Sequence, residues 1–195
     1  MTETLHPAQN RGFRELVAAS RHVVDHFEAL APRFEDQIAD ALTEGAKIAK
    51  ELLEAVRAAI SEHDLHGGRA AQGVGRSGAN LRGGVTDKFL EKNQALRMAA
   101  LDVQHTVTLL AYLESVSGKA ETEDLTELCH DWHGKMLDLE HRMRAAVIVL
   151  GTEPDTAIEP VDSGVLGRAA HSVGYWVGTF GEWFDRRDAE KRSDS

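Results

Sequence analysis

The sequence predicts an all-α fold, an up-down antiparallel bundle of four helices with an additional C-terminal amphipathic segment rich in glycine and aromatic residues. Four stretches of the chain carry apolar residues every three to four positions, which is the period of a helix with one buried face. None of these stretches shows the sustained alternation of a half-buried strand. The second, third and fourth stretches have similar lengths, which favours side-by-side helices at a shallow crossing angle.

The first two helices are expected at residues 12–31 and 33–63, with a tight corner at Pro32 between them. Proline pushes the preceding residue out of helical geometry, so one helix ends there and an antiparallel neighbour follows. The first apolar stripe consists of Phe13, Leu16, Val17, Ser20, Val24, Phe27 and Leu30. The second consists of Phe34, Ile38, Ala41, Leu42, Gly45, Ile48, Leu52, Val56 and Ile60.

The third and fourth helices are expected at residues 86–117 and 121–150. Thr86 is a good N-cap for the third helix, and Gly151 followed by Pro154 is a common stop signal for the fourth. The third stripe consists of Phe89, Asn93, Leu96, Ala100, Val103, Val107, Leu110 and Glu114. The fourth consists of Leu125, Cys129, Trp132, Met136, Leu139, Met143, Ala146 and Leu150.

The third helix carries a second, largely apolar line nearly opposite the first. This line consists of Met98, Leu101, His105, Leu109 and Tyr112. A helix that is apolar on two sides either lies at the centre of its bundle or contributes half of an oligomer contact. This second apolar line is therefore compatible with self-association of the chain.

Residues 65–85 depart from the helical pattern, since they contain seven glycines and no acidic residue. Glycine costs roughly 1 kcal/mol relative to alanine inside a helix, so we expect a connector here. Its arginines, Arg69, Arg76 and Arg82, are weak candidates for contact with anions. The GxGxxG pattern at residues 73–78 lacks the preceding strand that a dinucleotide site needs. The net charge of −10 argues against nucleic acid as a partner.

The last part of the chain is expected to comprise a linker at residues 152–160, an amphipathic segment at residues 161–186 and a charged tail at residues 187–195. Read as a helix, the amphipathic segment has glycines on one side and an interface stripe on the other. The stripe consists of Leu166, Val173, Trp176, Phe180 and Trp183. Large amphipathic rings suit a boundary between water and an apolar surface. The segment is expected to dock on a partner protein, to dock on a lipid or polymer interface, or to fold back on the bundle.

Ten histidines are the one compositional sign of a binding site. Asp102 and His105 form a carboxylate-x-x-histidine pair, and ferritin-like bundles hold two iron ions with such pairs on facing helices. The turn between the third and fourth helices brings His105 level with His133. The candidate ligands for zinc or iron are Asp102, His105, His130 and His133. His22 and His26 are a further pair, spaced by four residues.

The favoured function is non-enzymatic: a cytoplasmic helical interaction or scaffold protein that works through its C-terminal segment and needs no cofactor. Its expected partner is another protein or a second copy of the chain, and contact with a membrane surface stays open. No secretory signal or membrane-spanning run is expected. Cys129, the one cysteine, lies in an apolar stripe, which argues against a nucleophile. The alternative function is a ferritin-like or haemerythrin-like metal-binding bundle with zinc or iron.

Overall fold

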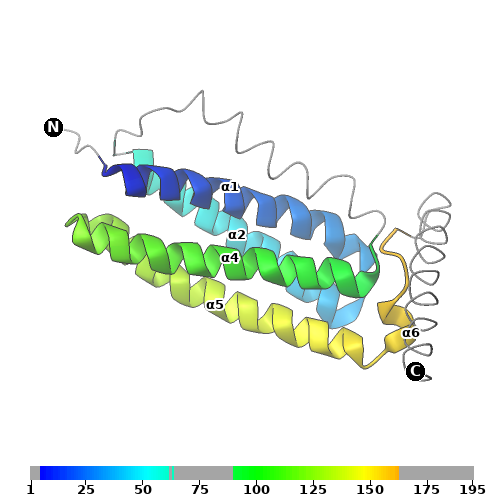
Figure 1. Ribbon diagram of the computed structural model, residues 1–195. Helices are drawn as coiled ribbons and strands as arrows, with labels where there is room; N and C mark the ends of the chain where they lie inside the picture. The colour runs from blue at the N-terminus through cyan, green and yellow to red at the C-terminus, as the bar shows by residue number, and fades with distance from the viewer. Residues whose placement is uncertain (1–4, 62, 64–89, 163–195) are drawn as a thin grey trace, which may run out of the picture.

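The computed structural model describes residues 5–61, 63 and 90–162. Over this part the chain forms long helices connected by short turns, with no β-strand (Figure 1). The helices are α1 (Pro7–Leu30), η1 (Ala31–Arg33, a 3-10 turn), α2 (Asp36–Ser61), α4 (Lys92–Lys119), α5 (Glu123–Gly151) and α6 (Pro154–Ala157). The predicted all-α bundle of four long helices is therefore confirmed for the described residues.

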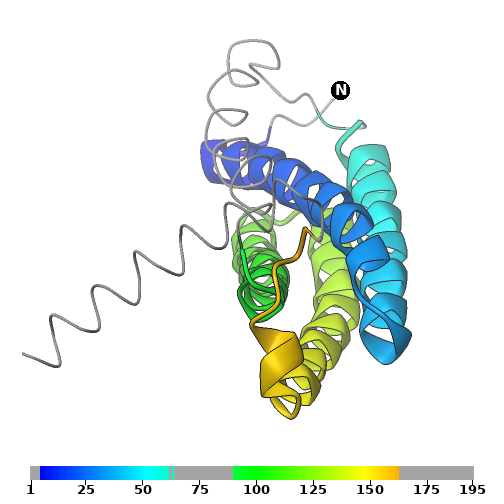
Figure 2. The same cartoon turned by 90° about the vertical axis from the view of Figure 1, so that its right-hand side faces the viewer.

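The four long helices form a ring in which every neighbour is antiparallel. α1 packs against α2 and α4, and α5 packs against the same two helices from the other side. Figure 2 views this ring nearly end on, with α6 beside the last turn of α5. The side-chain amide of Gln9, near the start of α1, donates to the hydroxyl of Ser117, near the end of α4 (3.3 Å). This contact fixes the antiparallel register of α1 and α4.

Along the chain, the four long helices α1, α2, α4 and α5 run up, down, down and up. α2 ends beside the start of α5, where His63 Nε2 lies 2.9 Å from Asp124 Oδ2. α4 begins at the opposite end, where the backbone N–H of Lys92 donates to the carbonyl of Glu159 (2.8 Å). The chain between Ser61 and Lys92 therefore connects opposite ends of the bundle, and α2 and α4 run in the same direction (Figure 1).

α1 begins at Pro7, five residues before the predicted start at residue 12. The Nδ1 of His6 accepts the backbone N–H of Ala8, and the Gln9 side chain accepts the N–H of His6 in return. Proline at the first helical position needs no hydrogen bond, which completes this start. Gly12, which marked the predicted boundary, lies inside the helix. α4 approaches closely at this glycine, since a Cβ on it would stand 2.6 Å from Leu113 Cδ2.

The other predicted helix starts also require correction. α2 begins at Asp36 instead of residue 33, because Pro32 lies in the η1 turn and Phe34 is extended. α4 begins at Lys92 instead of residue 86, with Glu91 as its N-cap and Gln94 as the reciprocal partner. The predicted cap at Thr86 lies outside the described residues. The remaining helix ends differ from the prediction by one or two residues, which is the usual uncertainty of a helix boundary.

The predicted linker at residues 152–160 is folded against the bundle. Pro154 starts the short helix α6, and residues beyond it pair with the start of α4. The backbone N–H of Val161 donates to the carbonyl of Leu90 (3.0 Å), and the side chain of Val161 is buried. The linker prediction considered composition alone and missed these backbone partners. Through these contacts, residues 152–162 close one end of the bundle.

The buried stripe predicted for the fourth helix is confirmed at all eight positions. In α1 the buried face is wider, because the helix lies between two neighbours: Val23 and His26 are buried, whereas Val17 and Val24 are partly exposed. Burial raises the pKa of Cys129 to about 12, with a smaller contribution from Glu114, so this thiol stays protonated. Among the described helices, none has the length and apolar character needed to cross a membrane.

The second apolar line of the third helix lies mostly on the surface of the described part. Leu109 is buried against the bundle, whereas Met98, Leu101 and Tyr112 are 36%, 55% and 48% exposed. α4 is therefore not the central helix of the described bundle. An oligomer contact through this line stays a prediction.

Candidate metal centre

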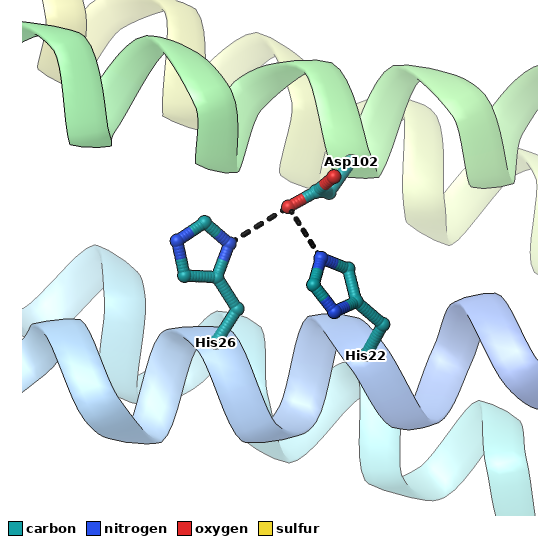
Figure 3. A group of neighbouring side chains, drawn as sticks. All are labelled: His22, His26 and Asp102. Atoms are coloured by element: carbon teal, nitrogen blue, oxygen red, sulfur yellow. Dashed lines mark hydrogen bonds and ion pairs between the residues drawn. The ribbon is translucent and has the colours of Figure 1, made fainter. Parts of the chain in front are cut away.

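Two histidines of α1 face a carboxylate of α4. His22 and His26 are four residues apart, which places their side chains one above the other on the same helix side. α4 packs against that side in antiparallel register and contributes Asp102, about three turns after its first residue. Figure 3 shows the two imidazoles rising from α1 toward this carboxylate. The site is thus built between two helices that are far apart in the sequence.

Both imidazoles meet the same oxygen of Asp102. His26 Nδ1 lies 2.7 Å from Asp102 Oδ2, and His22 Nε2 lies 3.2 Å from that oxygen (Figure 3). The ring centroids of the two histidines are 5.5 Å apart. One nitrogen from each ring and one carboxylate oxygen therefore converge on a small region between the helices.

The site runs from the interior of the bundle to its surface. The side chain of His26 is 5% exposed, whereas those of His22 and Asp102 are 23% and 22% exposed. A carboxylate removed from water needs compensating partners. The two imidazoles supply them, and the outer part of the site remains accessible to water.

The histidines also set the protonation state of the carboxyl group. Burial alone raises the pKa of Asp102, but hydrogen bonds and electrostatic attraction from His22 and His26 outweigh this effect. The pKa therefore lies below its ordinary value of 3.8. Asp102 is ionised at neutral pH, which is the form that binds cations.

The three side chains have donor atoms suited to a transition-metal ion. The ligand atoms all lie within 4.8 Å of one another. A tetrahedral ion bound at about 2.1 Å keeps its donor atoms about 3.4 Å apart, so small side-chain movements would bring all three into range. Imidazole nitrogen together with carboxylate oxygen suits zinc and iron. The residues present therefore fit such an ion.

The ligand set predicted from the sequence is not assembled in the described residues. Asp102 belongs to the site but faces α1, not α5. His105 Nε2 lies 3.4 Å from Glu15 of α1, and His130 Nδ1 lies 3.0 Å from Glu114 of α4. His133 is half-buried on α5 and belongs to no group of three or more potential ligands in the described part. The prediction paired α4 with α5, whereas the polar side of α4 at this level faces α1.

The spacing of His22 and His26 was the sequence signal for this site. Two histidines four residues apart on one helix are a known arrangement for binding zinc. The sequence did not reveal which helix faces them or in which register, so their carboxylate partner could not be chosen. That choice required the packing of α1 against α4.

The other predicted contact residues lie outside the described part of the chain. This holds for Arg69, Arg76 and Arg82 in the glycine-rich stretch and for the interface stripe of the C-terminal segment. The stripe consists of Leu166, Val173, Trp176, Phe180 and Trp183. Anion contact and docking through these residues stay predictions.

Known proteins do not assign a role to this pair of helices. Many unrelated activities use four-helix bundles, so the fold by itself does not indicate one. The chemistry of the three side chains is therefore the basis for any function. The sequence matches no protein-family model, and comparisons with curated proteins and solved structures likewise give no significant match.

Proposed function

We propose that this protein is a metal-binding four-helix bundle in which His22, His26 and Asp102 hold one divalent transition ion, zinc or iron(II). The observation that carries the proposal is the convergence of two imidazole nitrogens on a single carboxylate oxygen, at 2.7 and 3.2 Å. An imidazole pair and a carboxylate from two different helices form a compact donor set. Such a set is more specific than the scattered acidic groups of a protein surface.

The burial of the site supports this proposal. His26 is buried inside the bundle, at a position where an apolar side chain would need no polar partner. Polar groups in such positions are costly unless they are fully paired. A buried imidazole aimed at an ionised carboxylate is explained if His26 binds a metal ion.

The number of ligands indicates an open site. Structural zinc sites usually have four protein ligands, whereas sites that act on a bound molecule keep a position free. Three protein ligands would leave at least one position free, and the partial exposure of His22 and Asp102 supports access to it from solvent. A bound ion would supply Lewis acidity at that position.

The chain order agrees with a ferritin-like arrangement only in outline. Ferritin-like bundles also contain one long crossover, but they bind two ions with carboxylate and Glu-x-x-His ligands from all four helices. Here the histidine pair belongs to one helix and the carboxylate to its neighbour. The proposal is therefore a centre with a single ion.

A calorimetric titration of the untagged, EDTA-treated full chain with Zn²⁺, and with Fe²⁺ without oxygen, tests the proposal. We expect one ion per chain, and at least about tenfold weaker binding in His22→Ala and in Asp102→Asn. Asp124→Asn is the matched control, because Asp124 also faces a histidine, His63, but only one. Circular dichroism verifies that each variant is folded.

Two results would overturn the proposal. One is the absence of ion binding to the wild-type chain. The other is equal loss of affinity in Asp102→Asn and in the control, which would assign the binding to scattered surface groups.

A further inference from the structure

A fourth potential ligand lies one helical turn from Asp102. His105 follows Asp102 by three residues, so the two side chains leave α4 on neighbouring parts of its surface. The contact of His105 with Glu15 shows that its side chain points toward α1. His105 is thus on the same side of α4 as the metal centre.

The register of the two helices places His105 at the level of His22. Gly12 lies against Leu113, and His26 meets Asp102, so moving toward the start of α1 corresponds to moving toward the end of α4. One turn back from His26 is His22, and one turn forward from Asp102 is the turn that contains His105. The backbones of His22 and His105 therefore lie at about the same level of the bundle, whereas the imidazole of His105 extends toward Glu15, two turns nearer the start of α1.

The present partner of His105 holds it weakly. The side chains of His105 and Glu15 are 54% and 57% exposed, and His105 Nε2 lies 3.4 Å from Glu15 Oε1. Ion pairs on the surface contribute little to stability and exchange readily with water. The side chain of His105 can therefore leave Glu15 without disturbing the packing of the bundle.

We propose that His105 is the fourth, exchangeable ligand of the metal centre and that Glu15 competes with the ion for it. This inference rests on the proposed function of His22, His26 and Asp102. His105 would reach the centre by turning from Glu15 toward Asp102, which lies three residues before it on α4. When the ion binds, neutral His105 donates the nitrogen that faces Glu15, and a proton present on that nitrogen passes to water. The resulting set is three imidazoles and one carboxylate.

Co²⁺ is a suitable probe, because its visible absorption is strong in four-coordinate tetrahedral sites and weak in sites with more ligands. We expect His105→Ala to bind Co²⁺ about tenfold more weakly and with a shifted visible band, because a water oxygen replaces an imidazole nitrogen. His130→Ala is the matched control. His130 is also an exposed histidine paired with a glutamate, Glu114, but it lies away from the centre.

The role of Glu15 is tested by removing its charge. Glu15→Gln releases His105, so we expect Co²⁺ affinity to rise several-fold. Glu114→Gln, which releases His130 in the same way, leaves the affinity unchanged.

The outcomes separate the two proposals. If the wild-type chain binds no Co²⁺, the metal centre itself is wrong and the role of His105 with it. If binding depends on His22 and Asp102 but His105→Ala retains the affinity and the spectrum of the wild type, only the fourth ligand is wrong.

Discussion

At the scale of single residues, Asp102 makes the stability of the folded chain depend on pH. The ionised carboxylate accepts hydrogen bonds from two imidazoles in the folded chain, and the pKa of Asp102 is lowered. A group whose pKa is lower in the folded chain stabilises that chain when it is ionised. The stabilisation is complete above the unfolded pKa of 3.8 and is lost as the pH falls through the lower pKa of the folded chain.

We therefore expect Asp102→Asn, without metal, to lower the free energy of unfolding by about 1.5–3 kcal/mol at pH 5. The difference from wild type should shrink at pH 3, because below pH 3.8 the unfolded wild-type chain binds a proton at Asp102 more readily than the folded chain does. Urea denaturation of both proteins in EDTA measures it. Asp124→Asn should show a smaller effect because Asp124 is more exposed. A difference that is unchanged between pH 5 and pH 3 would contradict this account.

At the scale of helices, two glycines have opposite surroundings. A Cβ on Gly45 of α2 would lie 2.6 Å from Phe27 Cε2, and the ring of Phe27 is fully buried. A Cβ on Gly134 of α5 would meet no atom within 4 Å. Gly45 is thus required where α1 and α2 approach closely, whereas Gly134 is not required by packing.

We expect Gly45→Ala to lose about 1 kcal/mol of stability, because overpacking exceeds the gain in helix propensity. Gly134→Ala should gain up to about 1 kcal/mol, because only the propensity changes. Thermal denaturation of both variants measures the two effects. A gain of stability in Gly45→Ala would show that Phe27 can move aside.

The helices also show what the sequence could predict. The apolar period of α5 was enough to predict its buried stripe, since each position depends on the periodicity of one helix. The partner of His22 and His26 depends on which helices are adjacent, and the same stripe is compatible with several arrangements. Helix starts were missed where a local cap decided them, as at His6 and Glu91.

At the scale of the whole molecule, residues 152–162 close the end of the bundle where α4 begins. Val161 is 4% exposed there, whereas Ile158, three residues earlier, is 51% exposed. The two residues belong to the same short connection but differ in burial. Substitutions at these two positions therefore test how much this closure contributes to the stability of the folded chain.

We expect Val161→Asp to lower the unfolding free energy by about 2 kcal/mol or more, because it buries a charge and removes apolar contact. Ile158→Asp should change it by less than about 0.5 kcal/mol. Chemical denaturation of the full chain compares them. Equal effects at the two positions would mean that the closure does not contribute to stability.

The crossover between Ser61 and Lys92 divides the donor atoms between two helical hairpins. The α1–α2 hairpin carries both imidazoles, and the α4–α5 hairpin carries the carboxylate. A chain cut within the crossover would yield two fragments, neither with a complete donor set. Ion affinity would then report fragment complementation, and added metal would favour the reassembled pair by mass action.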